Sequence, residues 1–85
     1  MEKENQVQIK IKSIGENVAL VRMLASGFLY PYDLTIEILD EIKIALSEAV
    51  SNSIIHGYQD AEDKEITVEM EIHQRLLTIR VIDTG

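Results

Sequence analysis

The feature that most constrains the fold is a change in the spacing of apolar residues, which occurs twice along the chain. Apolar residues alternate with polar ones over residues 6–13, recur at helical spacing over residues 15–56, and alternate again over residues 65–83. Alternation predicts half-buried strands, and recurrence every three to four residues predicts amphipathic helices. The chain's single proline, Pro31, divides the helical stretch because its ring cannot continue a helix.

The predicted order of elements is therefore strand, helix, helix, strand, strand. With two helices on one face of an antiparallel sheet, this order predicts an α+β two-layer sandwich, and 85 residues make one domain at most. Ser13 and Glu16 have the spacing of a capping box for the first helix. Asp33 or Thr35 is expected to cap the second helix, and Gly57 to follow it as the C′ residue. We expect a strand over 6–13, helices over 15–30 and 35–56, and a hairpin of strands 65–72 and 76–83 that turns near residues 73–74.

Composition excludes several classes of protein. The net charge of −7 disfavours direct binding to nucleic acid, because the chain repels phosphate backbones. No apolar run approaches the roughly 20 residues that span a bilayer, and the polar start does not resemble a signal peptide. The chain has no cysteine, which excludes disulfides and cysteine-ligated zinc and fits a cytoplasmic protein.

The first predicted helix has unusually little polar surface. Arg22 is the only charged residue between Val18 and Tyr32. A helix of this kind is usually buried on more than one side. Two explanations stay open: the small domain wraps the helix, or a protein partner covers its second face. By default, Arg22 would extend its charge to water.

The stretch "LSEAVSNSIIHG" in the second predicted helix is the candidate site. Glu48, Asn52 and His56 follow one another at intervals of four residues, beside a cluster of small side chains. We expect Glu48 at the border of the apolar stripe, where partial desolvation makes a carboxylate a candidate general base. The amide oxygen of Asn52 can coordinate a hard cation such as Mg²⁺. The alternatives are that Glu48 is simply solvated and that His56 interacts with the last helix carbonyls. The expected apolar stripe comprises Ile38, Leu39, Ile42, Ala45, Leu46, Ala49 and Val50.

Asp83 is the second unusual residue. It continues the apolar face of the last predicted strand, which is set by Leu77, Ile79 and Val81. A buried carboxylate is costly without a donor, so Asp83 is expected to accept hydrogen bonds from a ligand amine. Gly85 would allow close approach of the backbone to that ligand. The alternative is that Asp-x-Gly forms an ordinary turn.

Together these segments resemble a known family. "DEIKIALSEAVSNSIIHGY" and "TIRVIDTG" are similar to motifs of the GHKL ATPase/kinase superfamily, and within it to the bacterial anti-sigma serine kinases, with the anti-sigma F factors as the nearest group. "ENVALVR" and "YPYDLTIEILDEIK" fit as well, so the resemblance covers nearly the whole chain. It implies a partial GHKL (Bergerat) fold. It also implies an anti-sigma factor that inhibits a sporulation-type sigma factor and uses Mg-ATP to phosphorylate a serine of an anti-anti-sigma factor.

The resemblance also implies roles for individual residues. Glu48 would be the general base for the incoming serine, and Asn52 would bind Mg²⁺ that bridges the ATP phosphates. Asp83 would accept a hydrogen bond from the adenine amino group, and Gly85 would leave room for the ring. Arg22 would contact the sigma factor and the anti-anti-sigma factor.

The sequence departs from the family's pattern at its end. The family's first glycine box continues as Asp-x-Gly-x-Gly, whereas this sequence stops at Gly85. We therefore expect residues 1–85 to be a truncated domain that lacks the lid, the second glycine box and the closing strands, binds ATP weakly or not at all, and has no useful kinase activity. A bare edge on the last strand predicts a homodimer or higher oligomer. The alternative function is a non-catalytic interaction domain with a vestigial Glu48–Asn52 motif. A histidine kinase is disfavoured, because no phosphoacceptor helix pair lies upstream.

Overall fold

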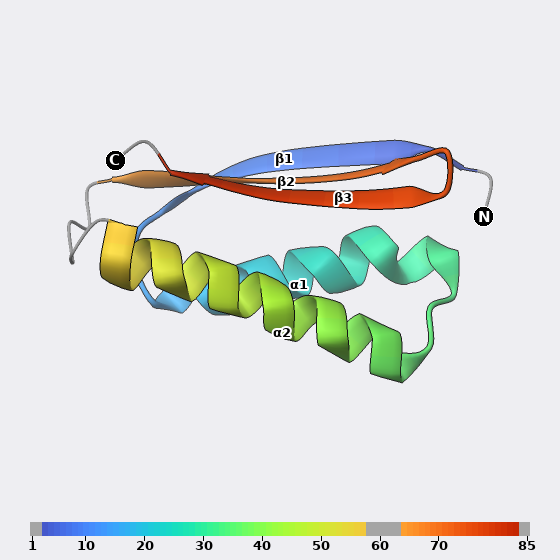
Figure 1. The fold of residues 1–85 in the computed structure, drawn as a ribbon, viewed down its shortest axis with the longest axis horizontal. Helices are drawn as coiled ribbons and strands as arrows, with labels where there is room; N and C mark the ends of the chain where they lie inside the picture. The colour runs from blue at the N-terminus through green and yellow to red at the C-terminus, as the bar shows by residue number, and fades with distance from the viewer. Residues whose placement is uncertain (1–2, 58–63, 84–85) are drawn as a thin grey trace.

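The computed structural model describes residues 3–57 and 64–83, and its elements follow the predicted order. A three-stranded sheet forms one layer and two long helices form the other (Figure 1). The predicted α+β two-layer sandwich is confirmed. Residues 58–63 and Gly85 lie outside the described residues. The elements are β1 (Asn5–Lys12), α1 (Glu16–Leu29), η1 (Tyr30–Tyr32), α2 (Ile36–Asn52), η2 (Ser53–Gly57), β2 (Glu65–His73) and β3 (Leu76–Asp83).

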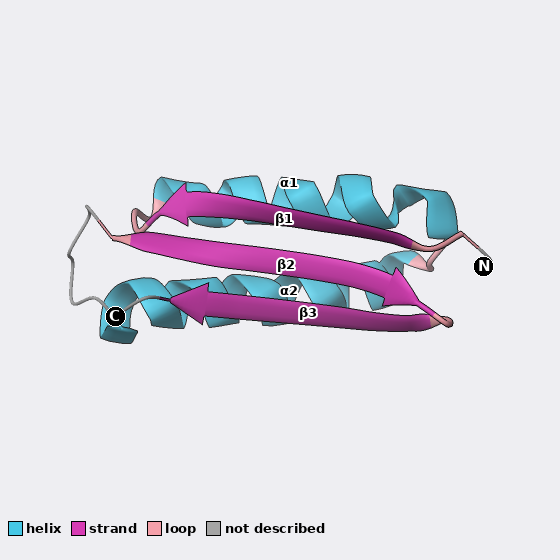
Figure 2. Ribbon diagram, turned by 90° about the horizontal axis from the view of Figure 1, so that it is seen from above, coloured by secondary structure: helices cyan, strands magenta, loops and turns pink. Residues whose placement is uncertain are grey.

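The sheet has the order β1-β2-β3, and both pairs of strands are antiparallel. Ile9, Val68 and Val81 lie in one row across it, because β1 and β3 each pair with the central strand β2. Side chains directly opposite one another lie on the same face of a sheet. Both helices cover that face, with α1 beneath β1 and α2 beneath β3 (Figure 2). Among the described residues, no helix combines the length and apolar character needed to cross a membrane.

The core lies between the two layers and is densest under β2. Every second residue of β2 is buried, because this strand has neighbours on both edges and helices beneath it. Each fully buried aliphatic side chain contributes about 1.5–3 kcal/mol of transfer free energy. The buried apolar residues are Ile11, Val21, Ala25, Phe28, Leu29, Leu46, Val50, Ile54, Ile66, Val68, Met70 and Ile72.

The start of α1 differs from the prediction. No side-chain hydrogen bond caps α1 within the described residues, and Gly15 takes the N-cap position. Ser13 instead continues the pairing of β1, since its backbone N–H donates to the carbonyl of Lys64 at 3.0 Å. The predicted capping box of Ser13 and Glu16 is therefore wrong. The hydroxyl of Ser13 is buried and has no partner among the described residues.

The start of α2 matches one of the two predicted caps. The side-chain oxygen of Thr35 accepts a hydrogen bond from the backbone N–H of Ile38 at 3.2 Å. Asp33 ends η1 in the left-handed conformation, with φ of 56°, and turns the chain toward α2. Thr35 is thus the N-cap, and Asp33 serves the preceding turn.

The β2–β3 hairpin turns at Gln74 and Arg75, in agreement with the predicted turn near residues 73–74. Both residues have positive φ, 52° and 66°, which the tight two-residue hairpin turn requires. The backbone N–H of Gln74 donates to the carboxylate of Glu4 at 3.1 Å, and His73 Nδ1 lies 3.1 Å from the same oxygen. The bond from Gln74, followed by that from His73, holds the pKa of Glu4 below its ordinary value. The N-terminal segment therefore supports this turn.

Candidate functional site

Glu48 and Asn52 lie one turn apart on α2, and both are exposed. Leu46 and Val50 are buried and fix α2 against the sheet. At 3.6 residues per turn, Glu48 lies about 200° around the helix from Leu46, so its side chain points away from the sheet. The predicted partial desolvation of Glu48 is therefore wrong, because no described residue covers this side of α2. The carboxylate and the amide are both accessible to a ligand.

The observed core stripe of α2 is narrower than the predicted one. Ala45, Ala49 and Ile38 were expected in the core and are exposed. The reason is the position of α2 beneath β3, the last strand of the sheet, so that only one side of the helix meets the other layer (Figure 2). The uncovered flank carries small side chains beside the carboxylate and the amide. It leaves room for a bulky ligand to approach the helix backbone.

The end of α2 also differs from the prediction. The helix does not stop before a C′ glycine at Gly57 but passes into the π-helical turn η2. The backbone N–H of Ser53 donates to the carbonyls of both Ala49 and Val50, where the hydrogen-bond pattern changes. Single π turns inside helices are uncommon and often mark functional sites. The side chain of His56 lies outside the described part of the structure, so its helix-end role stays a prediction.

Asp83 is the last residue of β3 and pairs with Ile66 of β2. It therefore lies on the face of the sheet that carries the helices, as predicted from the alternation. Asp83 is nevertheless exposed, so its predicted burial is wrong. The reason is that Asp83 is the last residue of β3, an edge strand of the sheet, and among the described residues only β2 pairs with it.

The end of β3 and the end of α2 lie side by side. Both views place the last residues of β3 beside the last turns of α2 (Figures 1 and 2). Asn52 and Asp83 therefore belong to the same end of the molecule, with Glu48 one turn further back along α2. The family resemblance implies one site for these three side chains, and the fold places the ends of their two elements side by side. Gly85, the fourth predicted site residue, lies outside the described residues.

The polar side chains at this end could bind the amino group of a ligand directly and its phosphate groups through a cation. A carboxylate such as Asp83 accepts hydrogen bonds from an amino group, and Glu48 can accept a proton. Among the described residues, no group of three or more His, Cys, Asp or Glu side chains could hold a metal ion by itself. A cation here would rest on the amide oxygen of Asn52 and take its other ligands from phosphate and water, which is the usual arrangement for Mg²⁺.

Arg22 is exposed on α1, as predicted, and lines a groove between the two helices. The groove has a volume of about 260 Å³, and Lys43 of α2 lies on its other side. Ala19, Met23 and Ser26 complete its lining. Lys43 was not predicted as a site residue, because helical spacing does not show how one helix packs against the other. Two cations beside one groove on an acidic protein form a surface that attracts anionic groups.

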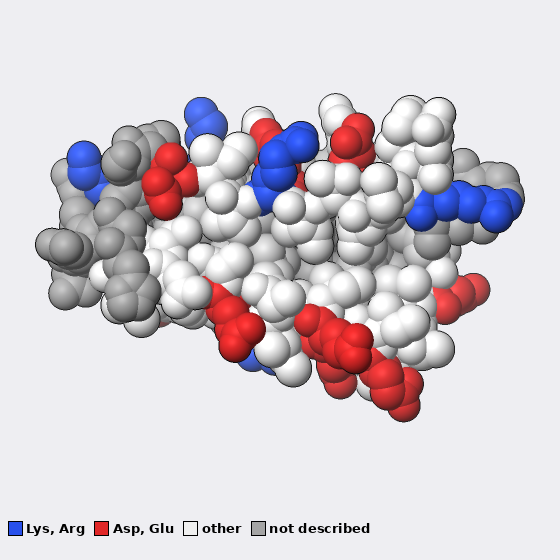
Figure 3. Space-filling view, in the orientation of Figure 1, with Lys and Arg blue, Asp and Glu red and all other residues white. Residues whose placement is uncertain are grey.

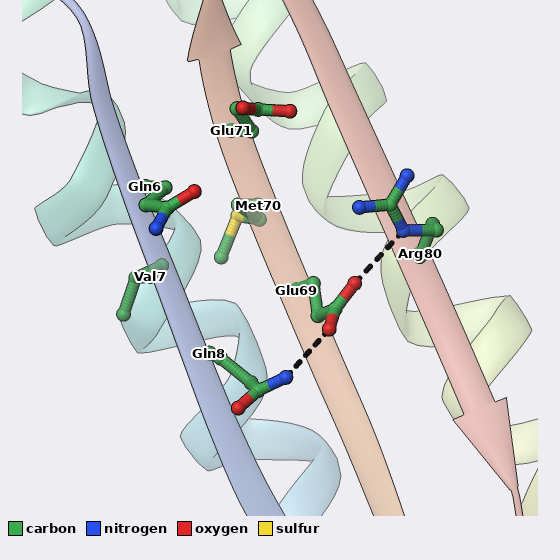
Figure 4. A pocket seen from close by; sticks show the side chains of 7 residues that line it. All are labelled: Gln6, Val7, Gln8, Glu69, Met70, Glu71 and Arg80. Carbon is green, nitrogen blue, oxygen red and sulfur yellow. Dashed lines mark hydrogen bonds and ion pairs between the residues drawn. The ribbon is translucent and has the colours of Figure 1, made fainter.

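A second polar cavity, of about 270 Å³, lies on the open face of the sheet (Figure 4). Glu69 lies at its centre and accepts hydrogen bonds from Arg80 Nε at 2.8 Å and from Gln8 Nε2 at 2.5 Å. The bond from Arg80, followed by that from Gln8, holds the pKa of Glu69 below its ordinary value. These groups join three strands on the face opposite the helices. The cavity is therefore separate from the end that carries Asn52 and Asp83.

Comparison with known proteins gives a family match and several similar proteins. A family profile described as "Histidine kinase-like ATPase domain" matches residues 11–85. Similar proteins include the anti-sigma F factors of Clostridium beijerinckii, 42% identical over 82 residues, and of Clostridium acetobutylicum, 39% identical over 82 residues. Each comparison covers 96% of this chain and 57% of the relative. The chain thus spans little more than half the length of these relatives.

Proposed function

The chain belongs to the family of histidine kinase-like ATPase domains, and on this premise we propose that it acts as an ATP-binding anti-sigma factor. The observation that carries the proposal is that the end of α2, which carries Asn52, lies beside the end of β3, which carries Asp83. The similarity to proteins named anti-sigma F factor supports it. In this proposal residues 1–85 form part of one nucleotide-binding domain and bind ATP weakly.

The nucleotide occupies the open flank of α2 in this proposal. Asp83 accepts a hydrogen bond from the adenine amino group, and Gly85 leaves room for the ring. The exposed small residues Ala45 and Ala49 let the ligand lie close to the helix. Mg²⁺ is held through the amide oxygen of Asn52 and neutralises charge on the phosphates.

We also infer that the complete domain has a protein serine kinase activity toward an anti-anti-sigma factor, whereas residues 1–85 by themselves have no useful activity. Phosphoryl transfer depends mainly on positioning and on neutralising charge, so few protein groups need to take part. Glu48 accepts the proton of the incoming serine hydroxyl, and its exposure on α2 leaves it open to a protein substrate. Asn52, one turn away, keeps the phosphates within reach of that hydroxyl.

The protein partners contact the helix layer in this proposal. Arg22 and Lys43 flank a groove that suits an acidic segment of a sporulation-type sigma factor or of an anti-anti-sigma factor. The chain also self-associates as a homodimer or higher oligomer, and it binds neither nucleic acid nor membrane. These partners place its action in the cytoplasm.

A non-catalytic interaction domain is the second candidate function. The exposure of Glu48 favours it, since a partly buried general base was expected and is not found. The apolar side chains exposed on α1 also favour it, because they offer a surface for a protein.

A nucleotide titration followed by NMR separates the two candidates. Mg-ATP is added to millimolar concentration to the isotopically labelled 85-residue chain. We expect the amide resonances of Glu48, Asn52 and Asp83 to shift, while that of Arg80 on the open face of the sheet stays in place. NMR detects weak binding, so low affinity does not obscure the result. If no resonance near these three residues shifts, the nucleotide proposal is wrong.

Partner binding is tested separately. We expect the chain to retain a sporulation-type sigma factor in a pull-down, and Arg22→Glu to abolish that retention. Lys10→Glu is the matched control, because Lys10 is also exposed but lies on β1. Equal loss with both variants would indicate a nonspecific charge effect rather than contact through Arg22.

A further inference from the structure

A stripe of accessible side chains runs along the outer side of α2, away from the sheet, and continues into η2. Its members follow one another at alternating intervals of four and three residues, so they share one side of the helix. All of them are exposed except Ser51, which is half-buried. We call these residues the α2 stripe: Glu37, Glu41, Ile44, Glu48, Ser51 and Ile55.

Glu48 separates the α2 stripe from the flank on which the nucleotide is proposed to lie. At 3.6 residues per turn, Asn52 and Ala45 lie about 40–60° around the helix to one side of Glu48. Ile44 and Ser51 lie about 40–60° to the other side. The proton acceptor of the proposed reaction therefore stands between two surfaces. A nucleotide on one surface and a serine hydroxyl from the other would meet at this carboxylate.

Two exposed isoleucines lie on the α2 stripe before and after Glu48. Ile44 precedes it by about one turn and Ile55 follows it by about two turns. Their side chains are 56% and 58% exposed. Removal of apolar surface from water favours association, so both side chains would stabilise contact with a partner that also presents apolar groups. A segment whose serine reaches Glu48 should therefore carry apolar side chains beside that serine.

The half of the α2 stripe nearer the start of the helix is acidic. Glu37 and Glu41 belong to the stripe and Asp40 lies beside it; all three are exposed, and red side chains line this lower border of the molecule in Figure 3. Lys43, the one basic residue of α2, lies about 140° around the helix from Glu48 and points elsewhere. A surface of this sign attracts basic groups. It repels a second copy of this acidic chain and nucleic acid alike.

We propose that the α2 stripe docks the phosphoacceptor segment of the protein substrate, a helix that presents a serine, apolar side chains beside it and basic residues two turns away. The spacing follows from α2, because Glu41 lies about 10 Å along the helix axis from Glu48. The apolar side chains of the segment contact Ile44 and Ile55, and its basic residues pair with Glu41. This docking surface is separate from the cationic groove between the two helices.

The inference rests on the kinase activity included in the proposed function, and peptide binding tests it without requiring activity from residues 1–85. The probe is a synthetic helical peptide with one serine, leucines one turn after it and lysines two turns after it. A matched peptide has glutamates in place of the lysines. We expect the lysine peptide to shift the amide resonances of Glu41, Ile44 and Glu48 in the isotopically labelled chain. It should bind at least about tenfold more tightly than the glutamate peptide. Equal affinities would overturn the proposal.

Two pairs of variants separate docking on the α2 stripe from nonspecific attraction to an acidic chain. Ile44→Ser should weaken binding of the lysine peptide about tenfold. Ile36→Ser should leave it unchanged, since Ile36 is 73% exposed but lies about 120° around α2 from Glu48. Glu41→Lys should reverse the preference toward the glutamate peptide. Glu16→Lys, at an exposed position on α1, changes the net charge equally and should keep the original preference. Equal effects within either pair would contradict docking on the stripe.

The peptide experiment and the nucleotide titration can fail independently. If Mg-ATP shifts the resonances of Asn52 and Asp83 but the lysine peptide shifts none on the α2 stripe, the inference is wrong and nucleotide binding stands. If the peptide binds to the stripe but Mg-ATP shifts no resonance, the docking surface stands and the nucleotide proposal is wrong. Stripe resonances that move with protein concentration alone would show a second copy at this surface and overturn the inference.

Discussion

Ile66 and Asp83 face each other across the β2–β3 ladder, yet Ile66 is fully buried and Asp83 is exposed. In this row of the sheet, the residue on the central strand β2 belongs to the core, whereas the residue on the edge strand β3 is accessible to solvent. Because the carboxylate of Asp83 is exposed and lies outside the core, its removal can change binding without unfolding the chain. Stability and ligand binding can therefore be separated by mutation in this small domain.

Asp83→Asn tests that separation. We expect the affinity for Mg-ATP to fall about tenfold or more, because a hydrogen bond to a charged group contributes about 1.5–3 kcal/mol. The free energy of unfolding should change by less than about 0.5 kcal/mol, as for other exposed residues. NMR titration gives the first quantity and urea denaturation the second. Asp40→Asn on α2 is the control and should change neither quantity. An affinity that Asp83→Asn leaves unchanged would exclude contact between Asp83 and the nucleotide.

Two methionines provide a matched test of the core. Met70 on β2 is 1% exposed, and Met23 on α1 is 71% exposed. We expect Met70→Ala to lower the free energy of unfolding by about 2–5 kcal/mol, because it removes buried apolar atoms and leaves a cavity. Met23→Ala should change it by less than about 0.5 kcal/mol, because the side chain of Met23 is largely exposed. Similar losses in urea denaturation would mean that α1 is covered on both sides in solution.

Substitution of the two residues in the β2–β3 turn is expected to stabilise the folded chain. Gln74 and Arg75 both adopt left-handed backbone angles, which cost about 1–2 kcal/mol for ordinary residues. The double change Gln74→Asn and Arg75→Gly supplies the residues that such turns prefer, so we expect about 1 kcal/mol of stabilisation. For a domain of this size, that raises the melting temperature by about 4–8 °C. The same double change at Gln6 and Val7, within β1, should destabilise instead. A lower melting temperature for the turn variant would show that the side chain of Gln74 or Arg75 matters more than backbone strain.

Much of the fold could be predicted from the spacing of apolar residues. The alternation in β1, β2 and β3 is a local property, and Pro31 separates the helices wherever they pack. Helix borders depend on more than spacing. Ser13 was predicted to cap α1 but is used to extend β1, and α2 ends in a π turn rather than at a glycine.

The site was predicted less completely, because exposure depends on which elements lie next to one another. The helical spacing placed Glu48 and Asn52 on one side of α2 but could not reveal that α2 lies at the edge of the sheet. That position leaves Glu48 and Asp83 exposed, contrary to expectation. The position of Lys43 across a groove from Arg22 depends on the packing of α1 against α2, which helical spacing does not show.

The N-cap of α2 offers a local test of stability. The side-chain oxygen of Thr35 accepts a hydrogen bond from the backbone N–H of Ile38. Because Ile38 lies in the first turn of α2, no carbonyl within the helix could accept that N–H. Thr35→Ala should lower the free energy of unfolding by about 1 kcal/mol, and Thr35→Ser should restore most of the loss because serine is an equally good cap. Urea denaturation measures both variants. If the serine variant is as unstable as the alanine variant, packing of the threonine methyl group rather than capping would be responsible.

The Glu69 carboxylate should make stability depend on pH. Hydrogen bonds from Arg80 and Gln8 hold its pKa below the ordinary value in the folded chain, so the unfolded chain binds a proton more readily. The stabilisation is thus fully present above about pH 4.3, the ordinary pKa of glutamate, and is lost as pH falls through the lower folded value.

Glu69→Gln should therefore be less stable than the unmodified chain at neutral pH, and the difference should shrink below about pH 4. Chemical denaturation at a series of pH values measures this difference. Glu41→Gln on α2, where the carboxylate is exposed, is the control. A difference between the unmodified chain and Glu69→Gln that stays constant from pH 7 to about pH 3 would show that the shape of the side chain, rather than its charge, matters at this position.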